Sequence, residues 1–100
     1  MSVSLSSAAQ AAAEPDEAPA TFRYSLLARP EPGVMPRVAE LFAKRGLVPL
    51  TWHSTTSASA LAIEVQIGGL DHEVADYIAR CMRQIVVVET VLTSETRFQG

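Results

Sequence analysis

The chain has 100 residues, with 8 Lys and Arg, 11 Asp and Glu, 2 His and 1 Cys, and its formal net charge is −3. This length allows one domain with one modest core, because domains typically hold about 100–150 residues. The single cysteine excludes an internal disulfide and a multi-cysteine zinc site. The acidic balance argues against nucleic acid as a partner, because such binding needs a basic surface.

The acidity is concentrated at the N-terminus. Residues 1–20 carry Glu14, Asp16 and Glu17 without any Lys or Arg, whereas the eight acidic residues of 21–100 balance its eight basic ones. This segment is rich in Ser, Ala and Pro and poor in large apolar side chains, so residues 1–20 are predicted to be a disordered tail. The chain has neither a signal peptide nor a stretch long enough to span a membrane, which predicts a cytoplasmic protein with no membrane partner.

The spacing of apolar residues predicts four strands. Apolar and polar side chains alternate with the period of a strand in residues 21–29, 47–56 and 60–67, and residues 86–93 are rich in β-branched side chains. Pro49 favours an edge position for the second strand. The pair Gly68-Gly69 is expected to end the third strand, and residues 95–100 are predicted to be a frayed C-terminus.

Two segments instead repeat with the period of a helix. In the first, Val34, Val38 and Phe42 share one face, Pro36 lies in the first turn and Gly46 provides the stop. In the second, Asp71 is the predicted N-cap, and an apolar stripe that includes Cys81 runs from Val74 to Ile85.

The predicted order is therefore β-α-β-β-α-β, which is typical of the α+β ferredoxin-like fold. We expect residues 21–94 to form one domain, a four-stranded antiparallel sheet with both helices on one face. The other sheet face and the free sheet edges are open to contacts, and an edge invites pairing with a second copy. This predicts a homodimer.

The fold alone decides no function, so the alternatives are separated by the residues they require. A metal-binding version needs paired thiols, and an RNA-binding version needs aromatic side chains on both central strands. The sequence has neither, and it has no asparagine for an acylphosphatase-like site. His53 and His72 lack further ligands at metal-binding spacing, and no nucleophile motif is present. We therefore predict no catalytic residue, no metal and no cofactor, and so no enzyme.

A resemblance to a known family rests on Pro32-Gly33-Val34-Met35 and on the run from Arg37 to Gly46, RVAELFAKRG. In their β-α-β-β-α-β setting these residues resemble an ACT domain. More narrowly, they resemble the small regulatory subunits of acetolactate synthase (acetohydroxyacid synthase), with a PGV start followed by Leu-Phe and a basic pair. Residues 75–91 also resemble the closing helix and strand of that family.

The resemblance implies a non-catalytic regulatory subunit in branched-chain amino-acid biosynthesis. Its partner would be a large thiamine-diphosphate-dependent catalytic subunit. An amino-acid effector would bind at a subunit interface, and the matching positions are Gly33, Val34, Met35 and Val48. Pro30 and Val48 stand where the family usually has polar residues, so we expect a weak response to amino acids or none.

Three further residues are candidates for the partner interface. Arg23 and Arg29 face a partner's acidic groups or lie on a solvated strand face, and Trp52 is a partner anchor or a core residue. The alternative function is a stand-alone dimeric ACT domain that senses a small ligand such as an amino acid.

Overall fold

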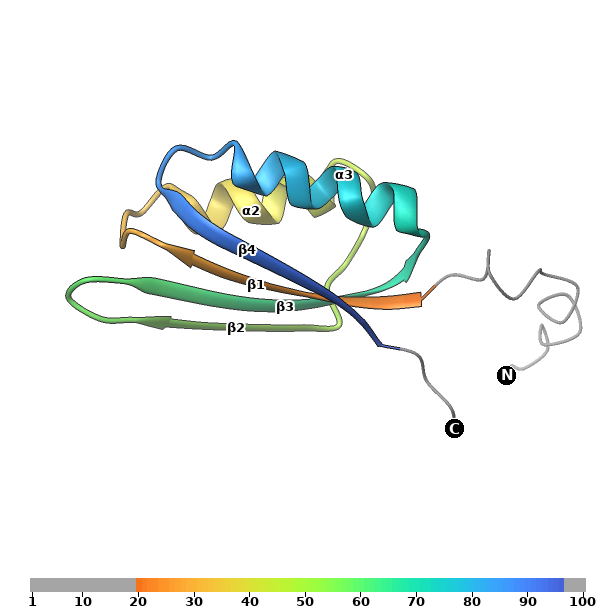
Figure 1. Cartoon of the computed structure of the whole chain (residues 1–100), viewed down its shortest axis with the longest axis horizontal. Coiled ribbons are helices and arrows are strands. Elements are labelled where there is room, and N and C mark those ends of the chain that lie inside the picture. The colour runs from red at the N-terminus through yellow and green to blue at the C-terminus, as the bar shows by residue number, and fades with distance from the viewer. Residues whose placement is uncertain (1–19, 97–100) are drawn as a thin grey trace, which may run out of the picture.

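The computed structural model describes residues 20–96 (Figure 1). Its elements in chain order are β1 (Ala20–Ala28), α2 (Val34–Ala43), β2 (Thr51–Thr56), β3 (Leu61–Leu70), α3 (His72–Arg83) and β4 (Val88–Thr96). The first strand begins one residue before the expected domain start, and the last ends two residues beyond its expected end. The rest of the predicted tail and of the predicted frayed end, residues 1–19 and 97–100, lies outside the described residues.

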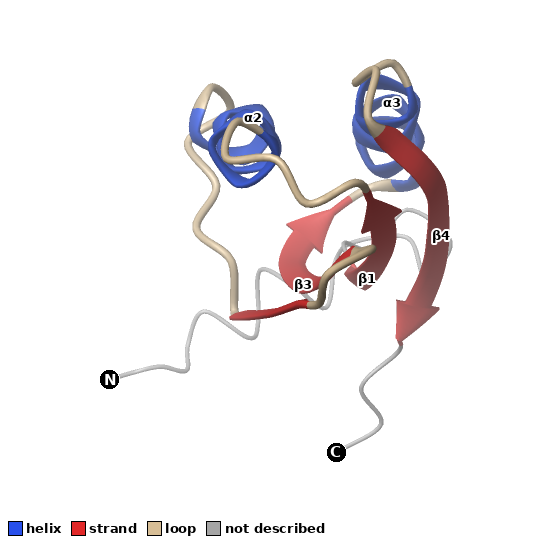
Figure 2. Ribbon diagram, turned by 90° about the vertical axis from the view of Figure 1, so that its left-hand side faces the viewer, coloured by secondary structure: helices blue, strands red, loops and turns tan. Residues whose placement is uncertain are grey.

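The four strands form one antiparallel sheet in the order β2-β3-β1-β4. Both helices lie on the same face of this sheet, with α3 above β4 at one side (Figures 1 and 2). The predicted α+β ferredoxin-like arrangement is therefore confirmed. Since β1 pairs with both β3 and β4, the two edges of the sheet are β2 and β4.

The core lies between the sheet and the two helices. The predicted alternation of buried and exposed side chains in β1 and β3 is confirmed. Tyr24, Val65 and Ile67 are fully buried, while their sequence neighbours are more exposed. The helix stripes are also confirmed, although Cys81 is only half-buried. The buried apolar residues are Phe22, Tyr24, Leu26, Ala28, Val34, Val38, Phe42, Leu61, Ile63, Val65, Ile67, Leu70, Ala75, Ile78, Ala79, Met82 and Val91.

The helices start in different ways. The carboxylate of Asp71 accepts a hydrogen bond of 2.9 Å from the amide of Val74, which confirms the predicted N-cap of α3. The N-cap of α2 is Gly33, which has no side chain to make such a bond. The predicted stop after α2 is also present, since Gly46 has a φ of 68°, a conformation that favours glycine.

The second and third strands differ from the prediction at one end. Residues 47–50 lie outside β2, although the amide of Leu50 already donates to the carbonyl of Gln66 over 2.7 Å. They connect α2 to the sheet, and Val48 is 82% exposed there. The prediction that Gly68-Gly69 ends β3 was wrong. The register slips there, Gly69 has a φ of 77°, and Leu70 returns to the core, so the two glycines form an irregularity within the strand.

The fourth strand starts later than predicted. The amide of Val88 donates to the carbonyl of Ile85 over 2.9 Å, so residues 85–88 form a turn after α3. Val86 lies in this turn and is 87% exposed. The β-branched run therefore covers both the turn and the first part of the strand, and side-chain type alone does not separate them.

Candidate functional site

The predicted effector site centres on the loop from Arg29 to Gly33, which leads from β1 into α2. The amide of Val34 donates to the carbonyl of Glu31, and the amide of Arg37 donates to that of Gly33. Within residues 20–96 the amides of Gly33 and Met35 make no hydrogen bond. Such free amides at a helix N-terminus attract a carboxylate or another anion.

Gly33 is not required by the fold of a single chain. Its φ is −80°, which any residue adopts, and a Cβ atom added there would meet nothing within 4 Å. The space above Gly33 is therefore open, and the backbone is accessible to a group from outside the chain.

The two residues after Gly33 play different parts. Val34 is 1% exposed and belongs to the core, so only its backbone is available at this site. Met35 is half-buried and forms part of a shallow hollow of about 500 Å³ beside α2. The other residues that line this hollow are Pro32, Pro36, Ala39 and Trp52.

This hollow combines Met35, which was predicted to bind the effector, with Trp52, which was predicted at the partner interface. Trp52 lies on β2 opposite Val65, so its side chain is on the helix side of the sheet, where it lines the same hollow as Met35 and Pro36 of α2. None of the residues that line the hollow carries a charge. Pro36 and Ala39 were not predicted as surface residues of this site. The available signal was the spacing of Ala39, which follows Met35 by four residues and Pro36 by three.

Val48 lies away from this loop. It follows the C-terminal end of α2, whereas Gly33 precedes the N-terminal end (Figure 1). A helix of ten residues is about 15 Å long. One chain therefore does not bring together the four residues predicted to bind an effector.

Of the two arginines predicted at the partner interface, Arg23 lies on the sheet face opposite to that of Trp52. Arg23 is exposed and lies opposite Gln66 and Ser94 on the sheet face away from the helices. Arg29 follows the end of β1 and forms an exposed ion pair of 3.6 Å with Glu31. An exposed pair of this kind contributes little to stability.

No group of three or more His, Cys, Asp or Glu in residues 20–96 is placed to hold a metal ion. His53 is exposed on β2, and His72 contacts Glu95 over 2.7 Å. The same part of the chain contains no helix long and apolar enough to cross a bilayer.

Tyr24 is the described group whose titration the fold changes most clearly. Its hydroxyl donates to the carbonyl of Ala75 over 2.7 Å and so ties β1 to α3. Burial, with a smaller contribution from the carboxylate of Asp76, raises the pKa of Tyr24 well above its ordinary value. The phenol is neutral and structural, since it lies inside the core.

Comparisons with known proteins agree with this architecture. The model of an ACT-like domain family matches residues 10–99, so the chain belongs to the ACT-like domain family. A search of curated proteins found no match. ACT domains are regulatory, non-catalytic domains, although some are parts of enzymes, and membership points to a regulatory, ligand-sensing role.

Solved structures show the same fold at low sequence identity. The ACT domain of GTP pyrophosphokinase from Chlorobium tepidum is 10% identical with a TM-score of 0.68, and the match covers 76% of this chain and 99% of that one. The uncharacterized protein TM1266 from Thermotoga maritima is 14% identical with a TM-score of 0.66, over 79% and 99% of the two chains. A homoserine dehydrogenase from Thiobacillus denitrificans is 15% identical with a TM-score of 0.71, over 87% of this chain but 20% of the enzyme.

Proposed function

We propose that the chain is a cytoplasmic, non-catalytic regulatory subunit of acetolactate synthase in branched-chain amino-acid biosynthesis. It binds the large thiamine-diphosphate-dependent catalytic subunit and responds weakly or not at all to amino-acid effectors. The observation that carries this proposal is the apolar hollow between α2 and β2, lined by Met35 and Trp52 next to the start of α2. The resemblance of residues 32–46 to the small subunits supplies the choice of partner.

The lining of the hollow suits an apolar protein surface better than a free amino acid. A zwitterion needs an oxygen acceptor for its ammonium group and several donors for its carboxylate. Pro36 supplies no amide donor, and none of the five residues that line the hollow carries a charge. A polar group left unpaired in such a place costs about 1–3 kcal/mol.

The same features favour a contact with a larger partner. Half-buried tryptophan side chains in apolar surroundings are frequent anchors of protein interfaces. Two exposed apolar residues, Val48 and Leu50, precede β2 and are 82% and 61% exposed. Beside them the edge of β2 is unpaired within the described chain. A catalytic subunit that covers this side would bury Trp52, Leu50 and Val48 together.

Co-purification tests this proposal. A tagged full-length chain is expected to retain the large acetolactate synthase subunit and to raise its activity on mixing. Trp52→Ala is expected to lower both effects about tenfold or more, because it removes the anchor. Thr55→Ala is the matched control, since Thr55 is exposed on the same strand and faces away from the hollow. If the chain neither retains the subunit nor changes its activity, the proposal is wrong.

A stand-alone dimeric sensor is the second candidate function, and the open backbone at Gly33 favours it. Since β1 and β2 both run antiparallel to β3, they are parallel to each other. A second copy paired antiparallel along β2 would therefore bring its Val48 to the end of the sheet where Gly33 lies. Calorimetry with valine, leucine and isoleucine tests this candidate. Tight binding that Gly33→Ala abolishes would support the sensor.

A further inference from the structure

We propose that a second copy of this chain pairs with it through the other edge of the sheet, β4, with the two α3 helices antiparallel above the junction. Figure 2 shows α3 directly over β4 at this side of the molecule. A copy joined to β4 would therefore bring its own α3 alongside. This inference does not depend on the catalytic partner, so its test and the co-purification fail separately.

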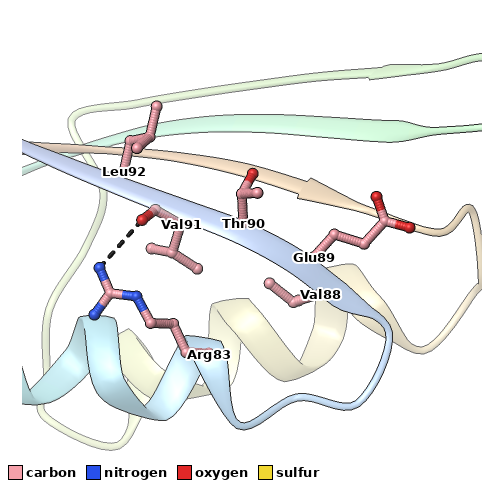
Figure 3. A pocket seen from close by; sticks show the side chains of 6 residues that line it. All are labelled: Arg83, Val88, Glu89, Thr90, Val91 and Leu92. Atoms are coloured by element: carbon pink, nitrogen blue, oxygen red, sulfur yellow. Dashed lines mark hydrogen bonds between the residues drawn. The ribbon is translucent and has the colours of Figure 1, made fainter.

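The backbone of β4 is available for a further strand. Val91 pairs with Leu26 of β1, yet its carbonyl accepts a hydrogen bond of 3.1 Å from the Nη2 atom of Arg83 outside the sheet (Figure 3). The carbonyl of Val91 therefore points away from β1. By the alternation of a strand, Thr93 also presents its backbone groups to this open edge, while Leu92 between them points its backbone groups to β1.

Shallow depressions flank this edge on the helix side. One of about 400 Å³ lies around Arg83 and Val88, and one of about 430 Å³ lies between Asp76, Arg80 and Thr93. The hydroxyl of Thr93 is buried and has no hydrogen-bond partner in the described part of the chain. The edge therefore has both space and an unsatisfied polar group beside it.

The charges on α3 identify the occupant. Glu73, Asp76, Arg80 and Arg83 follow one another at spacings of three and four residues, so they lie on one side of the helix. All four are exposed, and no ion pair among residues 20–96 involves any of them. The stripe is acidic in its first half and basic in its second. This order suits the helix dipole, and it is also complementary to an antiparallel copy of itself.

One register satisfies both the backbone and the charges. If Leu92 lies opposite Leu92 of the second copy, Val91 lies opposite Thr93 of that copy, and the outward backbone groups pair. Arg83 lies near Val91, and Asp76 near Thr93, so this register brings the basic half of one α3 to the acidic half of the other. It also covers Leu92, which is 70% exposed on the sheet face away from the helices. In this dimer the guanidinium of Arg83 no longer donates to the carbonyl of Val91, which pairs with the second copy, and it instead pairs with a carboxylate on the α3 of that copy.

Complementary charge variants test the pairing. In the full-length chain, Glu73→Lys with Asp76→Lys makes the stripe wholly basic, and Arg80→Glu with Arg83→Glu makes it wholly acidic. Each double variant alone is expected to self-associate about 100-fold more weakly than the wild type, because like charges then face each other. An equimolar mixture is expected to form a 1:1 heterodimer by native mass spectrometry. Circular dichroism checks that both variants fold.

Cross-linking tests the register. In a Cys81→Ser background, Leu92→Cys is expected to form an intersubunit disulfide under mild oxidation, because directly opposed residues of this type have Cα atoms about 4.5 Å apart. The matched control is His53→Cys, an exposed position on the β2 edge. Three outcomes overturn the proposal. They are cross-linking at position 53 and not at 92, a wild type that stays monomeric up to about 1 mM, and a mixture of charge variants that behaves like its separate components.

Discussion

The two edges of the sheet are built differently. The edge strand β2 has six residues and none of them is buried, while β4 has nine residues and places Val91 in the core at 6% exposure. Along β4 run α3 and the guanidinium of Arg83, whereas beside β2 lies an apolar hollow with Trp52. The β4 edge is therefore polar, and its charges are complementary to those of a second copy. The β2 edge is apolar on its helix side.

This difference shows how one small sheet can hold two kinds of contact. An exposed strand edge is open to pairing unless side chains or charges protect it. At β4 the protection comes from Arg83, a residue that can change partner. At β2 the open edge is continuous with exposed apolar side chains, which favours a larger protein surface.

The largest effect is expected at Val91. Val91→Asp places an unpaired carboxylate in the core and should lower the free energy of unfolding by about 3 kcal/mol or more. Ser54→Asp is the matched variant on the other edge, because Ser54 lies opposite Ile63 on the helix side of β2 but is exposed. It should change stability by less than about 1 kcal/mol. Equal losses in urea unfolding would contradict the view that, of the two edge strands, β4 is anchored more deeply in the core.

Tyr24 should give a smaller effect with a characteristic pH dependence. Tyr24→Phe removes the hydrogen bond to Ala75 that holds α3 over the sheet, at a cost of about 1 kcal/mol near neutral pH. Because the folded pKa of Tyr24 is raised, its stabilisation is present in full below the unfolded pKa of about 10 and is lost as the pH rises above it. The wild type should therefore lose stability more steeply than the variant between about pH 9 and 11. Parallel curves in that range would show that Tyr24 ionises as freely in the folded state as in the unfolded one.

A smaller loss of stability is expected from the residue that covers β4. Arg83→Met keeps most of the side-chain stem but removes the hydrogen bond to Val91, so the free energy of unfolding should fall by about 0.5–1 kcal/mol. Self-association should become several-fold weaker in sedimentation experiments, because methionine cannot pair with a carboxylate of the second copy. Tighter association would mean that Arg83 acts chiefly as a cover of the β4 edge and not as a binding charge.

The smallest effect on stability is expected at Gly33. Gly33→Ala should change the free energy of unfolding by less than about 0.5 kcal/mol, since the backbone angles suit alanine and the added Cβ meets no atom. Thermal unfolding measures this value. A loss above about 1 kcal/mol would mean that Gly33 has a structural role in the single chain. A loss of amino-acid binding in this variant would then not support the sensor function.

The sequence by itself determined the order of elements, the layer arrangement and most of the core. The spacing of apolar residues, every two residues in a strand and every 3.6 in a helix, reflects which side chains are buried. This spacing is a local property of each element. The cap at Asp71 and the stop at Gly46 were predictable for the same reason, because they depend on a few neighbouring residues. The strand ends were less predictable, since β-branched residues occupy both the turn at Val86 and β4.

Only the tertiary structure decided which surface residues lie together. It placed Trp52 of β2 at the same hollow as Met35 of α2, and it separated Val48 and Arg23 from the loop at Gly33. It also set the charged stripe of α3 beside the open edge of β4. These neighbours are far apart in the chain, and their meeting depends on strand order and on the face to which each side chain points. Neither property is encoded in a local period, because both follow from how the whole sheet packs against its helices.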